Sequence, residues 1–464
     1  MSALLVVANR LPVRRQIGPT GRAEWEPSPG GLASALSTAL AHREATWIGW
    51  SGDGDGGPPF DHRGTTLRPI GLSPGELAGF YEGFSNRTLW PLFHDAIRPP
   101  ELDPTWWSTY VAVNRRYAEA AADLAGRGAV VWVHDYQLQL VPGMLRARRP
   151  DLRIGFFLHI PYPPQELFMR LPWRRQLVEG LLGADVVGFQ VPVAARNFAV
   201  LARRLAGATG RYPDLVFDGR PVRVGAYPIS VDVDWFERLA ATAEAETSAR
   251  GVRERLGWPR VVLLGVDRLD YTKGIGARLA AYGDLLAAGR LSVPDCVMVQ
   301  VAAPSRGGIP AYRDERANLA HQVQTLNGRF GRKGIPAVHY LEESLEVHQL
   351  VGLYRAADVL VVTPYRDGMN LVVKEFVSCR LDGDGAVVLS EFAGAARQLT
   401  GATLVNPYDH DQLVAAIGSV VAAPEDERRR RMRRLRRAVR AWTAHDWSET
   451  FLADLDRFGS NRPR

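Results

Sequence analysis

The sequence has few of the features that mark secreted, membrane or metal-binding proteins. It contains two cysteines in 464 residues, Cys296 and Cys379, both in apolar surroundings. Disulfide frameworks and cysteine-based metal sites need more closely spaced cysteines, so we expect a reducing compartment, the cytoplasm. No run of about 18 apolar residues occurs, which argues against a membrane-spanning helix. The first apolar run, Leu4–Ala8, has no positively charged segment before it and predicts a strand instead of a signal peptide.

A calcium loop is also missing, although one segment resembles its start. The segment Asp53-Gly54-Asp55-Gly56-Gly57 has two acidic positions at suitable spacing. The third acidic position is Gly57 and the closing glutamate position is Gly64, so the ligand set is incomplete. We predict a surface loop here, and we expect neither a metal nor another cofactor.

Positive charge is concentrated in one segment. The net charge is +7, and residues 428–440 contain nine arginines; without these nine the charge is −2. Met432, Leu435, Val439 and Trp442 recur there at helical spacing, which predicts an amphipathic helix with an arginine-covered outer face. Such a helix is either solvated or a patch for nucleic acid or anionic membranes. The absence of interleaved aromatic residues favours the solvated helix, and we expect neither nucleic acid nor membrane as a partner.

Apolar strand patterns alternate with helical patterns along the whole chain. Continuous Val, Ile and Leu runs between helices indicate parallel sheets covered on both faces. We predict an α/β protein with two doubly wound Rossmann-like domains facing across a cleft, residues 1–228 and 229–446, and a tail, 447–464, that crosses back to the first domain. The predicted strands are Leu4–Ala8, Val130–Val133, Ile154–His159, Val186–Phe189, Val222–Tyr227, Val261–Val266, Val297–Val301, Ala337–Tyr340, Val359–Thr363, Val387–Leu389 and Leu404–Asn406.

The most informative segment is Val361–Glu375. An apolar run ends in Asp367-Gly368-Met369-Asn370-Leu371, and a helical pattern begins at once. A strand, a tight turn and a helix N-terminus present backbone N–H groups to an anion, usually phosphate. Glu375 follows Asp367 by about two helical turns, so both carboxylates can lie on one side of the same site. This arrangement suits a phosphorylated sugar; the alternative is an ordinary turn with Glu375 on a solvated face.

Other candidate residues also follow predicted strands. Arg10 ends the first strand, and the pair Gly30-Gly31 opens a helix. Together they either bind a phosphate, which Arg10 clamps and the glycines let approach the backbone, or have structural roles, with Arg10 capping the strand and the glycines turning the chain. The dense aromatic segment Tyr81–Trp90 is typical of a core or of a carbohydrate pocket, and its spacing favours the core. Asp135 comes just after one further predicted strand, and His159 ends another. A lone histidine on an apolar strand is more often a core residue, but two strand ends that both carry polar groups favour a site.

A pair of cations follows a strand in the second half of the chain. Arg268 and Lys273 lie five residues apart across a turn into a helix, and Arg306 follows the next strand. Two such cations could neutralise a diphosphate leaving group. The alternative is a surface ion network of Asp267, Arg268 and Asp270, which would contribute little to stability.

Taken in order, the motifs resemble those of the trehalose-6-phosphate synthases. The matching segments are NRLPV, PGGLASAL, WIGWSG, FSNRTLWPLFH, VWVHDYQL, GFFLHIPYP, VDRLDYTKGI, APSRG, TPYRDGMNLVVKE, LSEFAGAA and VNPYD, from about Leu4 to Trp447. Each is weak alone, but the ordered set is specific. The resemblance implies the GT-B glycosyltransferase fold and metal-independent transfer of glucose, with retention, from UDP-, GDP- or ADP-glucose to glucose 6-phosphate, giving α,α-trehalose 6-phosphate.

The resemblance also implies a role for each matched residue. The implied catalytic residues are Asp135, His159, Arg268, Lys273 and Asp367. The implied donor-binding residues are Gly31, His159, Arg268, Lys273, Asp367, Gly368, Met369, Asn370, Leu371, Val372 and Glu375. The implied acceptor-binding residues are Arg10, Tyr81, Trp90, Asp135 and Arg306.

Mechanism and partners follow from this set. No carboxylate is plainly placed as a nucleophile, which favours front-face attack, with a diphosphate oxygen taking the proton of the acceptor hydroxyl. The expected partners are the two small-molecule substrates. A related enzyme with another acceptor, of the glucosylglycerol-phosphate or aminocyclitol type, and a non-catalytic sugar-phosphate sensor are alternatives; the complete residue set opposes the sensor. The donor base and the oligomeric state, including a homo-oligomer, stay open.

Overall fold

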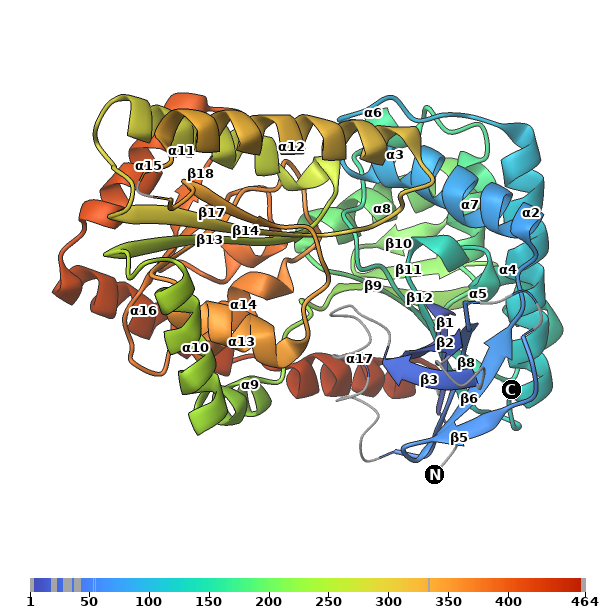
Figure 1. Ribbon diagram of the computed structural model, residues 1–464. Coiled ribbons are helices and arrows are strands. Elements are labelled where there is room, and N and C mark those ends of the chain that lie inside the picture. Colours follow the sequence, from blue (N-terminus) through green and yellow to red (C-terminus); the bar gives the residue numbers. More distant parts are fainter. Residues whose placement is uncertain are drawn as a thin grey trace. The chain divides into compact units, whose positions relative to one another are not determined.

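The computed structural model describes residues 4–17, 23–27, 36, 43–52, 54, 56–332 and 334–459. The chain forms two compact units, and Figure 1 labels most of their helices and many of their strands. Unit 1 comprises Met1–Ile229 together with Ala444–Arg464, and unit 2 comprises Ser230–Thr443. The predicted Gly30-Gly31 pair, and Asp53 and Asp55 of the acidic loop, lie outside the described residues.

Unit 1 is built on a large sheet. Among the described residues, its strands follow the order β10-β11-β12-β9-β8-β7-β1-β4-β6-β5. The central pairs are parallel, and antiparallel pairs lie at both edges. The strands are β1 (Leu4–Arg10), β4 (Ala45–Trp50), β5 (Phe60–His62), β6 (Thr65–Ile70), β7 (Val130–His134), β8 (Arg153–Phe157), β9 (Val186–Phe189), β10 (Thr209–Arg211), β11 (Asp214–Phe217) and β12 (Arg220–Ala226). A separate hairpin pairs β2 (Val13–Ile17) with β3 (Ala23–Pro27).

Helices connect these strands. Helix α4 starts where Asp103 accepts a hydrogen bond from the Thr105 amide and Pro104 takes the first position, which is favourable for proline. The segment between α2 and α3, η1 (Leu77–Leu89), is π-helical, a rare form that is often found at functional sites. The helices are α2 (Pro74–Glu76), η1, α3 (Trp90–Phe93), α4 (Pro104–Leu124), η2 (Tyr136–Leu138), α5 (Val141–Arg148), α6 (Gln165–Phe168), α7 (Arg174–Leu181) and α8 (Pro192–Ala206).

The C-terminal helix α17 (Ala444–Gly459) packs on the sheet of unit 1. Its Phe451 ring stacks on Trp132 of β7 at a centroid distance of 4.8 Å. Glycines in the neighbouring strands leave space for this ring: a Cβ atom at Gly155 or Gly188 would lie 2.7 Å from Phe451. Larger residues at those positions would displace the helix, so the end of the chain belongs to the core of unit 1.

Unit 2 contains a fully parallel sheet. In the described ranges its strand order is β15-β14-β13-β16-β17-β18. Numbered within the unit, this is the 3-2-1-4-5-6 order of a Rossmann fold, in which ligands bind at the carboxyl ends of strands where the order reverses. That point lies between β13 and β16. The strands are β13 (Val261–Arg268), β14 (Cys296–Ala303), β15 (Val338–Leu341), β16 (Val359–Val362), β17 (Ala386–Ser390) and β18 (Thr403–Val405).

Helices flank this sheet as parallel strand connections require. They are α9 (Val233–Ala240), α10 (Ala243–Arg255), η3 (Tyr271–Lys273), α11 (Ile275–Ala287), α12 (Pro310–Phe330), α13 (Val347–Ala356), α14 (Leu371–Cys379), η4 (Gly394–Arg397), α15 (His410–Ala422) and α16 (Glu425–Arg440). None of the helices in the described ranges combines the length and apolarity needed to span a bilayer.

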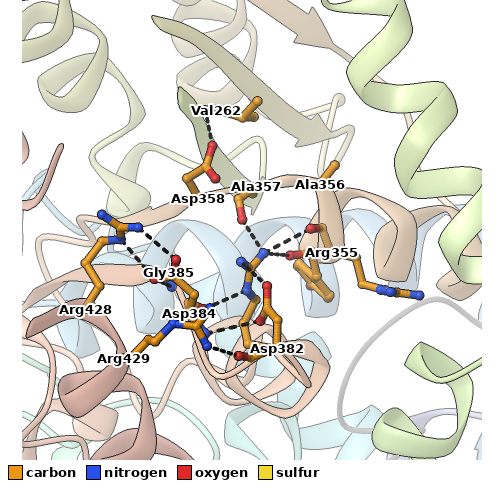
Figure 2. A network of polar contacts seen from close by, with 12 residues as sticks. Val262, Arg355, Ala356, Ala357, Asp358, Asp382, Asp384, Gly385, Arg428 and Arg429 are labelled. Carbon is orange, nitrogen blue, oxygen red and sulfur yellow. Dashed lines mark hydrogen bonds and ion pairs between the residues drawn. The ribbon is translucent and has the colours of Figure 1, made fainter. Parts of the chain in front are cut away.

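Helix α16 is the predicted arginine-rich amphipathic helix. Met432, Leu435 and Val439 are buried, which confirms these positions of the predicted apolar stripe. Trp442 lies after the helix ends at Arg440 and is partly exposed, so the prediction is wrong for that residue. Several of its arginines are anchored on unit 2. Arg428 pairs with both carboxylate oxygens of Asp384, at 2.9 and 2.8 Å, and Figure 2 shows this pair. Arg436 donates to the Ser378 carbonyl at the end of α14. Part of the positive charge therefore holds the helix in place and satisfies the carbonyls that end α14.

Candidate active site

Unit 2 brings two predicted segments together beyond β13 and β16. Lys273, in the turn η3 after β13, places its Nζ 2.7 Å from Oδ2 of Asp367, in the loop after β16. The side chains are 10% and 15% exposed, so this pair is largely shielded from water. The Asn370 side-chain amide donates to the same carboxylate oxygen at 3.3 Å. Asp367 is thus held from two sides at the point where the strand order reverses.

The loop after β16 leads directly into the N-terminus of α14. Asn370 has a φ of +82° and caps the helix, because its side-chain oxygen accepts a hydrogen bond from the Val373 amide at 3.2 Å. The amides of Leu371 and Val372 come before the capped amide, in the first turn, where backbone N–H groups have no helical partner. This end of α14 therefore carries the positive end of the helix dipole and suits an anion.

A close backbone contact fixes the turn before α14. A Cβ atom at Gly394 would lie 2.0 Å from the Gly368 carbonyl oxygen, so only glycine fits there. We expect Gly394→Ala to push Gly368 away and to lower the free energy of unfolding by about 1–3 kcal/mol. Thermal unfolding of both proteins measures this effect. Gly307→Ala, where a Cβ atom meets nothing within 4 Å, serves as the control, and an equal midpoint for Gly394→Ala would contradict the tight contact.

Asp270 is the buried centre of a cation cluster. Its side chain is 0% exposed; Oδ1 accepts hydrogen bonds from Thr272, and Oδ2 lies 3.3 Å from Arg306 and 4.0 Å from Arg268. Burial raises the pKa of Asp270, but the charges of Arg306, Arg268 and Lys273 outweigh it, so the net pKa is lowered. The alternative of a surface ion network is therefore wrong for Asp270, because its carboxylate is buried and not at the surface.

Arg268 and Arg306 differ in exposure. The Arg268 side chain is 48% exposed, whereas that of Arg306 is 4% exposed and also donates to the Tyr312 hydroxyl. Asp270 therefore orients two cations, of which Arg268 is the accessible one. Glu375 lies farther along α14, where it accepts a hydrogen bond from Tyr354 of α13 at 2.8 Å. Burial raises the pKa of Glu375.

Unit 1 brings Arg10 and Tyr81 together with Trp50. The Arg10 guanidinium carbon lies 4.4 Å from the ring centroid of Trp50 and 5.4 Å from that of Tyr81. Cation–π contacts of this kind hold a guanidinium in place while its edge stays available for hydrogen bonds. Trp90 is 3% exposed and packs on the rings of His94 and Tyr136, as a core residue does. Its role in binding stays a prediction.

The ends of β7 and β8 are joined by three polar residues. Asp135 has a φ of +73°, an uncommon backbone conformation for a residue other than glycine, and its Oδ1 accepts a hydrogen bond from the His159 amide at 3.2 Å. Nδ1 of His134 lies 3.1 Å from Nε2 of His159. Strained residues concentrate at functional sites, and they persist only where neighbouring contacts hold them. The two strand ends that were predicted separately are therefore one group.

Both histidines are neutral near pH 7. Burial, and then the charge of His159, holds the pKa of His134 well below its usual range, and burial lowers the pKa of His159 to about 3. One ring nitrogen therefore donates its proton to the other ring. If His134 donates, Nδ1 of His159 carries the proton and can donate to a ligand; if His159 donates, its Nδ1 can only accept.

This burial predicts a loss of stability in acid. Because the folded pKa values lie below the unfolded value of about 6.5, the unfolded chain binds more protons, and stability falls by about 1.4 kcal/mol per pH unit and per histidine below that value. We expect the thermal midpoint to drop between pH 7 and pH 5 more in the wild type than in His134→Gln. An equal drop in both proteins would contradict the buried neutral pair.

Sequence reasoning missed several residues of these groups. Trp50 lay inside a quoted motif, but nothing in its spacing showed that it stacks on Arg10. Asn370 was predicted as a donor-binding residue, but its role as the cap of α14 was not predicted. Arg278 left no signal at all, because an arginine in a helical pattern is normally predicted to face solvent.

Fold and site together define a class of protein. The chain has two Rossmann-like sheets, and cations and a helix N-terminus lie where the strand order of the second sheet reverses. This is the architecture of a GT-B glycosyltransferase. The model for glycosyltransferase family 20 matches residues 2–457. The chain belongs to this family.

Individual relatives agree with this assignment. The chain is 50% identical over 475 residues to a trehalose-6-phosphate synthase of Mycolicibacterium gilvum, covering 99% of this chain and 94% of the relative. A structure of an α,α-trehalose-phosphate synthase (UDP-forming) from Burkholderia xenovorans in complex with glucose-6-phosphate is 35% identical, with a TM-score of 0.89 and coverage of 98% and 99%. A structure from E. coli, described as bound with UDP-2-fluoro glucose, is 33% identical, with a TM-score of 0.89 and full coverage of both chains. The predicted GT-B fold is confirmed.

Proposed function

We propose that the protein moves glucose from a nucleotide-glucose to glucose 6-phosphate, with retention, giving α,α-trehalose 6-phosphate and a nucleoside diphosphate. The observation that carries this proposal is the joint placement of Arg268, the Lys273–Asp367 pair and the α14 N-terminus in unit 2. A diphosphate needs cations and amides, and a hexose needs a carboxylate that is fixed in place. The names of the full-length relatives support the same reaction.

Unit 2 binds the donor in this account. Arg268 and Lys273 neutralise the diphosphate, and the amides of Leu371 and Val372 add hydrogen bonds at the positive end of α14. Asp367, held by Lys273 and Asn370, accepts hydrogen bonds from the glucose hydroxyls. Glu375 is proposed to hold the ribose hydroxyls, with Tyr354 fixing its carboxylate.

Unit 1 binds the acceptor. Arg10, stacked on Trp50 and Tyr81, presents a pre-oriented guanidinium to the phosphate of glucose 6-phosphate. Asp135 lies beside the acceptor sugar, and the neutral His159 exchanges hydrogen bonds with a hydroxyl of the transferred glucose. Arg306 of unit 2 is proposed to contribute a further cation to the acceptor phosphate.

Front-face attack accounts for retention. The anomeric hydroxyl of glucose 6-phosphate approaches the donor anomeric carbon on the side from which the diphosphate leaves. A new C–O bond forms, the bond to the diphosphate oxygen breaks, and the acceptor proton passes to a diphosphate oxygen. Asp367 is proposed to hold the glucose hydroxyls, with Lys273 and Asn370 fixing its Oδ2, and not to act as a nucleophile. The chain contributes position and positive charge.

We also propose a cytoplasmic location, because Cys296 and Cys379 are free and buried, as in a reducing compartment. The small-molecule substrates are the proposed partners.

The proposed reaction is tested by nucleoside diphosphate release from UDP-, GDP- and ADP-glucose, each with and without glucose 6-phosphate. We expect release with at least one donor, and only when glucose 6-phosphate is present. Release that does not depend on any acceptor would indicate a hydrolase, and binding of glucose 6-phosphate without release would indicate a sensor. Glycerol 3-phosphate as a second acceptor separates the related glucosylglycerol-phosphate activity.

A further inference from the structure

Arg278 of α11 is a fully buried arginine beneath the donor-binding residues of unit 2. Its side chain is 0% exposed, and its Nη1 lies 2.7 Å from Oδ2 of Asp267, which is 2% exposed. Nε donates to the Thr363 hydroxyl at 2.9 Å, directly after β16. Nη1 also lies 3.4 Å from the side-chain oxygen of Gln300 on β14. One guanidinium thus ties together the carboxyl-terminal parts of β14, β13 and β16, which are neighbours in the sheet.

The same guanidinium holds the turn that carries Lys273. Nη2 of Arg278 donates to the Lys273 carbonyl at 3.0 Å. The Thr363 hydroxyl, already bonded to Arg278, donates to the Gly274 carbonyl at 3.0 Å. Gly274 itself has a φ of +60°, and a Cβ atom there would lie 2.1 Å from the Thr363 carbonyl oxygen. Both carbonyls of the Lys273–Gly274 turn are therefore fixed by Arg278 and its neighbour.

The sequence of β13 accommodates this guanidinium. A Cβ atom at Gly265 would lie 2.6 Å from Nη1 of Arg278 and 2.2 Å from the side-chain oxygen of Gln300. Any other residue at Gly265 would therefore force Arg278 or Gln300 to move. A buried charge is costly to retain, and the four hydrogen bonds that Arg278 donates to Asp267, Gln300, Thr363 and Lys273 point to a task beyond packing.

We infer that Arg278 is a positioning residue for donor binding: it fixes the Lys273–Gly274 turn, so that Nζ of Lys273 meets the donor diphosphate in one orientation. The inference rests on the proposed function, in which Lys273 binds that diphosphate. Arg278 is buried and acts through the Lys273 carbonyl and Thr363.

The gentlest test is Thr363→Val, which keeps the shape of a buried side chain and removes only the hydroxyl between Arg278 and Gly274. We expect it to weaken binding of the nucleoside diphosphate by about tenfold, measured by calorimetry, and to raise the donor KM by a similar factor. Arg278→Lys, which keeps the charge but loses the planar fork, should weaken binding further. Binding of glucose 6-phosphate should stay within about twofold, because its main ligands are proposed to lie in unit 1.

Arg253 is the matched control, because it joins the same two strands at their other ends. Its Nη2 lies 2.7 Å from both carboxylate oxygens of Asp358, which precedes β16, and Asp358 accepts a hydrogen bond from the Val262 amide of β13 at 2.7 Å. Figure 2 shows the contact between Asp358 and Val262. We expect Arg253→Lys to lower the thermal midpoint but to leave nucleoside diphosphate binding and the donor KM unchanged.

The outcomes separate positioning from stability. Weaker diphosphate binding in Thr363→Val and Arg278→Lys, with normal binding in Arg253→Lys, would support the inference. Equal diphosphate binding in wild type and Thr363→Val, or an equal loss in Arg253→Lys, would overturn it. Calorimetry with UDP, GDP and ADP needs no turnover, so it tests the inference separately from the proposed reaction. If the proposed reaction is wrong, the wild-type protein would bind a nucleoside diphosphate but would not release one from a nucleotide-glucose when glucose 6-phosphate is added.

Discussion

Replacing Arg268 by alanine is expected to lower the rate of glucose transfer by about a hundred- to a thousandfold. Arg268 is the last residue of β13 and the accessible cation of the cluster around Asp270, with a side chain that is 48% exposed. In the proposed reaction, negative charge grows on the departing diphosphate, and a pre-oriented cation stabilises that charge more in the transition state than in the ground state. Steady-state kinetics with saturating donor measures the loss.

Binding of the acceptor separates this role from a general defect. Glucose 6-phosphate should bind Arg268→Ala with an affinity within about twofold of the wild type, because Arg268 is proposed to contact the donor diphosphate and Arg10 is the main proposed ligand of the acceptor phosphate. Arg434→Ala, which removes an exposed arginine of α16, should leave both rate and binding unchanged. If acceptor affinity fell as much as the rate in Arg268→Ala, the proposed division between donor and acceptor residues would be wrong.

Replacing Asp367 by alanine should also remove most of the turnover, but it should not weaken binding of a nucleoside diphosphate. The carboxylate is proposed to hold glucose hydroxyls, and we expect the rate to fall by at least about a hundredfold. Its removal also takes a negative charge away from Lys273, which now lies 2.7 Å from it. A nucleoside diphosphate without the sugar should therefore bind as tightly as before, or more tightly.

Asp367→Asn gives the matched comparison, because it keeps the shape and removes the charge. It should retain more activity than Asp367→Ala, since an amide oxygen still accepts hydrogen bonds from hydroxyls. Rates by nucleotide release and affinities by calorimetry give both quantities on the same samples. Near wild-type turnover in Asp367→Ala would remove this residue from the proposed mechanism.

The fold was predictable where apolar patterns are continuous. The runs that became β7, β13 and β16 are rich in Val and Leu and begin with uninterrupted apolar residues, as central parallel strands do. Strands outside this pattern were missed. β4 (Ala45–Trp50) mixes Trp and Gly with apolar residues, and β10 (Thr209–Arg211) is short and exposed at the edge of its sheet.

The candidate site was predictable segment by segment, but its pairings were not. The turn before α14 and the Arg268–Lys273 cations were both visible, because each follows a recognisable strand. That Lys273 meets Asp367, 94 positions away, depends on β13 lying next to β16, which strand patterns alone do not specify. Asp270 was named only in the alternative of a surface ion network, because composition carries no information on burial. The π-helical η1 has no sequence signature that we could read.

The most direct test of the central claim is the structure of the product. The protein is incubated with glucose 6-phosphate and with the active nucleotide-glucose carrying ¹³C at the donor anomeric carbon, and NMR identifies the new linkage. The account predicts one labelled product, α,α-1,1-linked trehalose 6-phosphate, with the label in the unphosphorylated ring. A β-configured label, a linkage to another hydroxyl, or labelled free glucose would contradict retaining transfer to glucose 6-phosphate.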